Sequence, residues 1–257
     1  MTALPKAVLF DLDDTLFDHQ HASACALGEL RNRYAADIAF EAFAAEHARV
    51  LEKFHLRFLN GEFTLDAARA ARMVEMFAAF GEAVSEAKAV EVALRYRELH
   101  QANRRLVAGA GELLEALHGR TKLAIVTNNS VSEQWDKLRY LGIADRFDAV
   151  LISEEIGMTK PDRAIFHAAL FRLDCAQGDA VMVGDNWEAD VMGARSAGIA
   201  AIWFNRFNQP RRAPAPLTEI TALAPLRVVM KAMEQAMHET SHKHKGKEHG
   251  KLEQLAS

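Results

Sequence analysis

Short apolar runs recur along the chain, and each of them ends in polar or charged residues. The clearest are KAVLFDL at 6–12, KLAIVTN at 122–128 and AVMVGDN at 180–186. Runs of this length and make-up are typical of strands that are buried in a parallel sheet. Two weaker runs of the same kind lie at 147–153 and 200–204. The pattern therefore predicts a sheet of buried, parallel strands.

Helical patterns separate these runs, with apolar residues recurring at helical spacing. They lie at 111–117, 132–141, 165–173 and 189–197. Strands that alternate with helices indicate an α/β fold, in which a Rossmann-like parallel sheet carries helices on both faces. Active groups in such folds gather at the carboxyl ends of the strands. Asp11, Thr127 and Asp185 all stand at such ends.

The segment between the first two predicted strands has a different pattern. Residues 17–107 are rich in Ala, Leu, Glu and Arg, with apolar positions at helical spacing and no clear strand. Thr64 follows an Asn-Gly turn signal and is a suitable helix N-cap. We therefore predict an all-helical cap domain at 17–107, inserted into a core domain formed by 1–16 and 108–237. The polar, His- and Lys-rich residues 238–257 are expected to form a disordered tail.

Composition and charge narrow the class of protein. Half of the 257 residues are apolar, the net charge is only -4, and no basic stripe indicates nucleic-acid binding. No apolar run reaches the ~18 residues of a membrane span, and no signal-peptide pattern is visible. Cys25 and Cys175 have no metal-binding spacing and are expected to be buried or partly buried thiols. We expect a cytoplasmic protein with neither nucleic-acid nor membrane partners.

Three aspartates crowd the end of the first predicted strand. Asp11, Asp13 and Asp14 occupy three of four consecutive positions, directly after an apolar run. Buried carboxylates repel one another and lose hydration, so a cation or an electrophile is expected beside them. A Ca²⁺ loop is a poor alternative, because DLDDT lacks the oxygen spacing and the glycine of an EF-hand.

Four separated segments carry candidate chemistry: FDLDDT at 10–15, VTNNS at 126–130, TKPD at 159–162 and GDNWEAD at 184–190. Each alone has an ordinary explanation, such as an N-cap for a strand-end aspartate. In this order they resemble the motifs of the haloacid dehalogenase (HAD) superfamily, in its subgroup with a helical cap after the first motif. The resemblance covers residues 5–235. It is greatest to phosphatases related to nucleoside 5′-monophosphatases and N-acylneuraminate-9-phosphatases.

The resemblance implies a role for each acidic residue of the motifs. Asp11 would be the nucleophile that forms an aspartyl-phosphate, and Asp13 the general acid and then the general base. Mg²⁺ would be held by the carboxylates of Asp11 and Asp185 and the backbone carbonyl of Asp13. Asp190 would support the ion directly or through its waters.

The other motif residues would bind phosphate. The Thr127 hydroxyl and the Asn128 backbone N–H would donate to phosphoryl oxygens, and the Lys160 ammonium would offset their charge. Asp14 departs from the glycine that is frequent in the family and is interpreted as structural. Trp187 is interpreted as a packing residue.

Substrate choice is expected to depend on the cap, which in this subgroup closes over the site. Candidates are Asp18, His19 and His21 in the first loop and Arg69 and Arg72, three positions apart on one helical face. Each of them has an alternative as an ordinary solvated residue.

The sequence thus predicts a Mg²⁺-dependent phosphatase of a small phosphorylated metabolite, a nucleotide or a sugar phosphate. A dehalogenase of the same superfamily is an alternative, in which Asp11 attacks carbon without a metal. Asp13 and the Asp185/Asp190 pair argue against it. A phosphomutase and a non-catalytic binding protein on the same scaffold also remain open.

Overall fold

The structure is a computed structural model that describes residues 4–210 and 218–239. The chain divides into two compact units. One comprises the residues up to Asp18 together with those from Leu106 onward, and the other comprises His19–Arg105. A helical segment is thus inserted between the first and second strands, as the sequence predicts.

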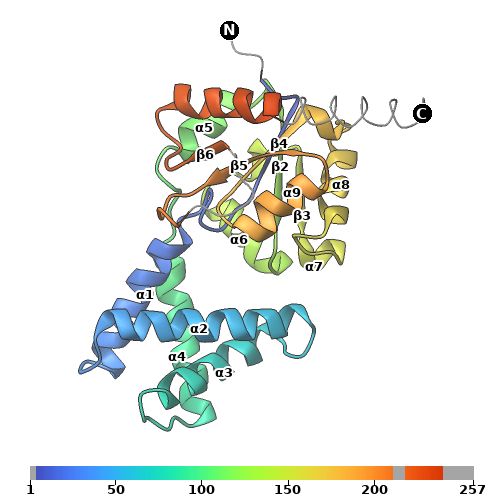
Figure 1. Cartoon of the computed structure of the whole chain (residues 1–257). Helices are drawn as coiled ribbons and strands as arrows, with labels where there is room; N and C mark the ends of the chain where they lie inside the picture. Colours follow the sequence, from blue (N-terminus) through green and yellow to red (C-terminus); the bar gives the residue numbers. More distant parts are fainter. Residues whose placement is uncertain (1–3, 211–217, 240–257) are drawn as a thin grey trace, which may run out of the picture. The chain divides into compact units, whose positions relative to one another are not determined.

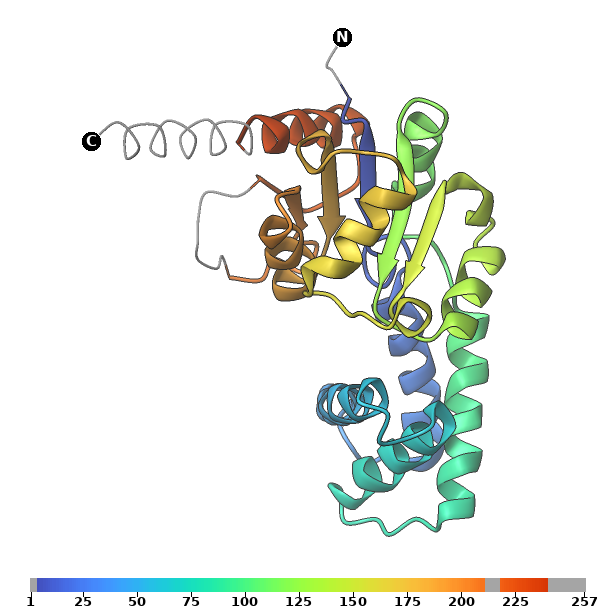
Figure 2. The same cartoon turned by 90° about the vertical axis from the view of Figure 1, so that its right-hand side faces the viewer.

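A parallel sheet forms the centre of the first unit, the core (Figure 1). Its strands run in the order β3-β2-β1-β4-β5-β6, and every neighbouring pair is parallel. Helices cover both of its faces (Figures 1 and 2), so the predicted α/β fold is confirmed. The strands are β1 (Ala7–Phe10), β2 (Lys122–Thr127), β3 (Ala149–Ile152), β4 (Ala180–Gly184), β5 (Ala200–Phe204) and β6 (Thr218–Ile220).

Helices alternate with these strands along the core. Ile165 and Phe166 of α8 are buried in one cluster with Leu9 of β1 and Val126 of β2, which fixes this helix on one face of the sheet. The α-helices are α5 (Ala110–Leu117), α6 (Val131–Tyr140), α7 (Ser153–Ile156), α8 (Arg163–Arg172), α9 (Gly193–Ser196) and a helix at 226–239.

Strand β1 occupies a central position, and its composition follows from that. All of Ala7–Phe10 is buried, because the strand pairs on both sides and is covered on both faces. Its register places Phe10 opposite Ile125 of β2 and Val183 of β4. The residues that follow these three strands therefore emerge at one edge of the sheet.

Two parts of the core differ from the predicted pattern. The edge strand β6 was not predicted, because three residues are too few to show an alternating pattern. The segment 189–197, predicted as one helix, is instead a π-helix η3 (Trp187–Met192) followed by the short helix α9. A Cβ at Gly193, where the two meet, would lie 2.8 Å from the Phe166 ring, so close packing against α8 accompanies this change.

The second unit, the cap, consists of the four helices α1–α4. They pack on one another (Figure 2). Phe43, Met73, Met76 and Phe77 are among the buried side chains of its own apolar core. Thr64 caps α3 as predicted, since its hydroxyl accepts from the N–H of Ala67 over 3.3 Å. The helices are α1 (His19–Tyr34), α2 (Phe40–Leu59), α3 (Leu65–Ala78) and α4 (Glu86–Ala102).

None of the described helices is both long enough and apolar enough to span a membrane. Of the predicted tail, residues 238 and 239 are the end of the helix at 226–239. Residues 240–257 lie outside the described residues.

Candidate active site

The carboxyl ends of the central strands bring predicted site residues to one edge of the sheet. Asp11 follows β1, Thr127 is the last residue of β2, and Asp185 follows β4. The Asp11 N–H donates to the carbonyl of Val183 over 3.0 Å, so the pairing of β1 with β4 continues into the site.

Three carboxylates form the centre of this edge. One oxygen each from Asp11, Asp185 and Asp190 lies within 4.8 Å of the other two. Asp190 projects from the π-helix η3, and its Oδ2 accepts from the N–H of Asn186 over 2.9 Å. A Cβ at Gly184 would lie 2.3 Å from the same Oδ2, so the end of β4 must be glycine for Asp190 to come this close.

A buried lysine lies between two of these carboxylates. Nζ of Lys160 donates to Oδ1 of Asp11 and to Oδ1 of Asp190, each over 2.6 Å. The side chain of Asn128 holds the Lys160 backbone, because its Oδ1 accepts from the Lys160 N–H and its Nδ2 donates to the Lys160 carbonyl, both over 2.8 Å. The sequence predicts only a backbone role for Asn128, and its side chain adds a second one.

Burial dominates the electrostatics of this cluster. It raises the pKa of Asp11 to about 7 and the pKa of Asp185 to about 9, and neighbouring carboxylates add to both shifts. Burial alone would lower the pKa of Lys160, but Asp11 and Asp190 together raise it above its ordinary value. The Lys160 ammonium thus contacts two of the three clustered carboxylates, and further positive charge would stabilise the cluster. Clustered carboxylate oxygens are ligands that fit Mg²⁺.

Asp13, two residues beyond Asp11, has a separate set of partners. Its Oδ1 accepts from Nζ of Lys137 over 2.5 Å, and its Oδ2 accepts from Nε2 of Gln134 over 3.0 Å. The same Gln134 nitrogen donates to Oγ1 of Thr127 over 2.7 Å. Two aspartates of one motif are therefore held by different residues from different elements.

The motifs that meet at this edge belong to a known family. Residues 5–198 match the family described as haloacid dehalogenase-like hydrolase. The chain belongs to this family. The resemblance inferred from the four motifs is confirmed, and so is the prediction that the protein is a HAD-family hydrolase.

Proteins similar to this HAD hydrolase include phosphatases of two kinds. It is 33% identical over 214 residues to ribulose-1,5-bisphosphate 5-phosphatase of Halopiger xanaduensis, covering 79% of this chain and 85% of the relative. It is 30% identical over 206 residues to pyrimidine 5′-nucleotidase PynA of Streptococcus pneumoniae, covering 78% and 84%. The structure of the HAD-hydrolase YfnB of Bacillus subtilis, bound to magnesium, matches with 26% identity and a TM-score of 0.71, covering 89% of this chain and 99% of that one.

Two further residues of the first HAD motif shape the site. Asp14 has a left-handed backbone with φ 61°, which accounts for the frequent glycine at this position of the family. Thr15 is buried, and its Oγ1 accepts from the Asp185 N–H over 3.1 Å. Thr15 thereby connects the motif after β1 to the motif after β4. The sequence pattern indicates no role for Thr15, although it stands within the first motif.

The packing interpretation of Trp187 is confirmed. Its ring is buried and meets Trp203 edge-on, with ring centroids 5.0 Å apart. Nε1 of Trp203 donates to the Asp185 carbonyl over 2.9 Å. The two tryptophans therefore support the loop that carries Asp185.

Several predicted substrate-contacting residues make other contacts. Asp18 belongs to the core and pairs with Arg206 at 2.6 Å. His19 lies 3.3 Å from His100 within the cap. Arg72 is buried in the cap, so its alternative as a solvated residue is wrong. In the cap His21 lies 3.7 Å from the Cys25 sulfur, and Arg69 pairs with Asp66 at 2.9 Å.

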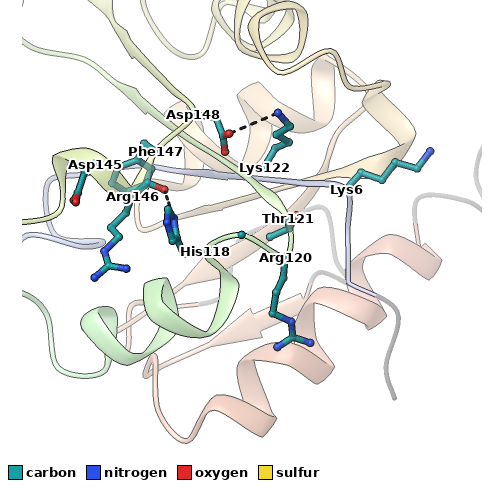
Figure 3. A pocket seen from close by; sticks show the side chains of 10 residues that line it. Lys6, His118, Arg120, Thr121, Lys122, Asp145, Arg146, Phe147 and Asp148 are labelled. Atoms are coloured by element: carbon teal, nitrogen blue, oxygen red, sulfur yellow. Dashed lines mark hydrogen bonds and ion pairs between the residues drawn. The ribbon is translucent and has the colours of Figure 1, made fainter.

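A hollow of about 540 Å³ lies at the other edge of the sheet, around the amino ends of β1 and β2 (Figure 3). Several of its charged residues have partners of opposite sign. Lys122 lies 3.6 Å from Asp148, and Arg146 lies 2.8 Å from Glu115. This hollow contains no set of clustered carboxylates comparable to that at the carboxyl edge among the described residues. The carboxyl edge is therefore the candidate active site.

Proposed function

We propose that this HAD hydrolase is a Mg²⁺-dependent phosphatase of a small-metabolite phosphomonoester, a nucleotide or a sugar phosphate, and that it acts through an aspartyl-phosphate. The observation that carries the proposal is the pair of separately held aspartates. Asp11, one of the three clustered carboxylates, contacts Lys160. Asp13, two residues further along the chain, contacts Lys137 instead. One carboxylate can attack phosphorus while the other transfers protons.

In the first step, a carboxylate oxygen of Asp11 bonds to phosphorus as the ester P–O bond breaks. Asp13 in its acid form gives its proton to the departing alkoxide oxygen. The Lys160 ammonium, 2.6 Å from Asp11, faces the incoming phosphoryl oxygens and opposes their repulsion by the carboxylates. Thr127 and the Asn128 N–H, at the end of β2, donate to those oxygens.

In the second step, Asp13 takes a proton from water, whose oxygen bonds to phosphorus as the Asp11–phosphorus bond breaks. Inorganic phosphate and the original Asp11 carboxylate result. Asp13 can serve in both steps because proton loss in the first step prepares it as a base for the second.

The carboxylates of Asp11, Asp185 and Asp190 would hold Mg²⁺, together with the backbone carbonyl of Asp13. Their spacing within 4.8 Å and the raised pKa values of Asp11 and Asp185 fit a site that takes up a cation. Bound there, the metal supplies positive charge against the phosphoryl oxygens. The magnesium in the related YfnB structure supports this assignment.

The phosphatase reaction is favoured over the two alternative reactions. A dehalogenase that attacks carbon needs neither the carboxylates of Asp185 and Asp190 beside Asp11 nor an acid at position 13. All of these residues are present. A phosphomutase must return the phosphoryl group to its substrate. The names of the two similar phosphatases share a phosphate ester on a sugar-containing metabolite, which supports the proposed substrate class.

The test is phosphate release by the purified full chain from p-nitrophenyl phosphate and from a panel of nucleotide and sugar phosphates, with Mg²⁺ or with EDTA. We expect Mg²⁺-dependent hydrolysis that falls by at least about 10⁴-fold in Asp11→Asn, since the nucleophile is lost. Asp145→Asn is the matched control, because this exposed aspartate lies at the opposite edge.

The outcomes separate the candidate functions. Halide release from a 2-haloacid in EDTA without phosphatase activity would make the protein a dehalogenase. An isomeric sugar phosphate in place of free phosphate would make it a phosphomutase. No turnover of any ester would leave only a binding function, and each of these results overturns the proposal.

A further inference from the structure

Two polar side chains of α6 are buried where its helical pattern would place apolar ones. Gln134 is fully buried and Lys137 is 4% exposed, and both lie on the face that also buries Leu138. Polar groups are costly to bury without partners. Their partners therefore indicate why the chain keeps them there.

Lys137 contacts the side chain assigned to proton transfer. Its ammonium lies 2.5 Å from Oδ1 of Asp13 and 5.2 Å from the centroid of the Phe17 ring. The Asp13 side chain remains 27% exposed, while that of Lys137 is 5% exposed. The buried lysine thus holds a carboxylate that still has access to solvent and ligands.

Gln134 holds the other oxygen of the same carboxylate. Its Nε2 donates to Oδ2 of Asp13 and also to Oγ1 of Thr127. When Asp13 is ionised, its oxygens only accept hydrogen bonds, and the amide nitrogen of Gln134 is the group that faces them. Lys137 contacts one oxygen of Asp13 and Gln134 contacts the other. The two contacts together fix the orientation of the carboxylate plane.

The bond to Thr127 has a second consequence. Because Oγ1 of Thr127 accepts from Gln134, the hydroxyl hydrogen of Thr127 is available for a different acceptor. A phosphoryl oxygen at the carboxyl end of β2 is such an acceptor. Gln134 therefore joins the proton-transferring carboxylate to the phosphate-binding hydroxyl through one nitrogen atom.

We propose that Gln134 and Lys137 are positioning residues for the phosphatase reaction: Lys137 and Gln134 together orient Asp13 toward the leaving oxygen, and Gln134 keeps Thr127 a donor to phosphate. The inference rests on the proposed function. Helix α6, which lies outside the four motifs, would then contribute to departure of the leaving group through these two residues.

The consequence is a dependence on the leaving group. An alkoxide leaves poorly unless an acid protonates it, whereas p-nitrophenolate leaves without a proton. General acid catalysis contributes about 10²–10⁴-fold where it is needed. A displaced Asp13 should therefore slow the hydrolysis of an alkyl phosphate far more than that of p-nitrophenyl phosphate. A residue that only stabilises the fold would slow both esters equally.

The experiment compares kcat/KM for p-nitrophenyl phosphate with kcat/KM for the best alkyl phosphate of the metabolite panel, in wild type, Lys137→Met and Gln134→Met. This quantity covers the steps up to departure of the leaving group, so later hydrolysis of the aspartyl-phosphate does not enter. Both esters are measured on one protein preparation. The ratio of the two values is then independent of the fraction of folded protein.

We expect Lys137→Met to lower the alkyl-to-nitrophenyl ratio by about 30-fold or more, within the range of general acid catalysis. Gln134→Met should lower it to a smaller extent and also raise KM for both esters, since Thr127 loses its partner. Lys137→Arg, which keeps a cation, should recover part of the ratio. Arg139→Met, on the exposed face of α6, is the control and should keep the wild-type ratio.

An unchanged ratio in both Met variants would overturn the inference, even if both are less active than wild type. Should Lys137→Met fail to fold, Gln134→Met and Lys137→Arg give the same comparison. A wild-type protein that hydrolyses neither ester would instead refute the proposed function, so the two failures are distinguishable.

Discussion

The two edges of the sheet both collect charged residues, but they balance the charges differently. At the amino edge, Lys6 and Lys122 pair with single aspartates at 2.8 and 3.6 Å, and these side chains are largely exposed. At the carboxyl edge, Asp11 and Asp190 are buried against Lys160, with a third carboxylate close by. Water screens the first set of charges, whereas the second depends on its counter-charges. Buried and incompletely compensated charge, rather than charge as such, distinguishes the site.

The largest expected effect concerns the metal ligands. Asp185→Asn should lower phosphatase activity by about 10³-fold, because charge stabilisation by a bound metal is worth several kcal/mol. It should also raise the Mg²⁺ concentration needed for half-maximal activity. Asp145→Asn at the amino edge makes the same charge change and should alter neither value. An unchanged Mg²⁺ requirement in Asp185→Asn would show that this residue is not a ligand.

The next effect concerns the stability that Lys160 provides. Lys160→Met leaves Asp11 and Asp190 without their shared cation, and breaking a buried pair in this way costs about 3–5 kcal/mol. We expect that loss in the free energy of unfolding, measured by urea at pH 8 without metal. Lys122→Met, which removes an exposed pair, should stay close to wild type. Equal losses in the two variants would remove the distinction between the edges.

A third effect is a pH dependence of stability. The folded metal-free protein has raised pKa values at Asp11 and Asp185, about 7 and about 9, so it binds more protons than the unfolded chain above pH 4. Its stability should therefore fall as the pH rises from 5 to 9. Mg²⁺ should oppose this fall, because it stabilises the carboxylates in their charged form.

Thermal unfolding with and without Mg²⁺ at pH 5 and pH 8 measures this linkage. We expect stabilisation by Mg²⁺ to be clearly larger at pH 8 than at pH 5. Equal stabilisation at both values would mean that the metal does not bind to these carboxylates.

The residues at strand ends were predictable, and the residues that support them were not. Asp11, Thr127 and Asp185 follow apolar runs, so the pattern of the chain places them at one edge. Lys160 lies outside any strand, and only the family motif indicated its position. The structure places it against two carboxylates.

Supporting contacts are missed because they join positions far apart in sequence. Gln134 and Lys137 meet Asp13 across 121 and 124 positions, and Thr15 meets Asp185 across 170. A signal was nonetheless present in α6, where polar residues occupy its buried face. The π-helix that carries Asp190 has no comparable signal, since a one-residue change in helical spacing is invisible in so short a pattern.

The most direct test of the account is to locate the phosphoryl group during turnover. The Mg²⁺-loaded protein would be quenched in acid while it hydrolyses p-nitrophenyl phosphate, digested at low pH and mapped by mass spectrometry. We predict one phosphoryl group on Asp11 and none in Asp11→Asn. Two results would contradict the central claim. One is turnover with the phosphoryl group on another residue. The other is an unphosphorylated Asp11 in wild-type protein that is quenched at steady state with saturating ester.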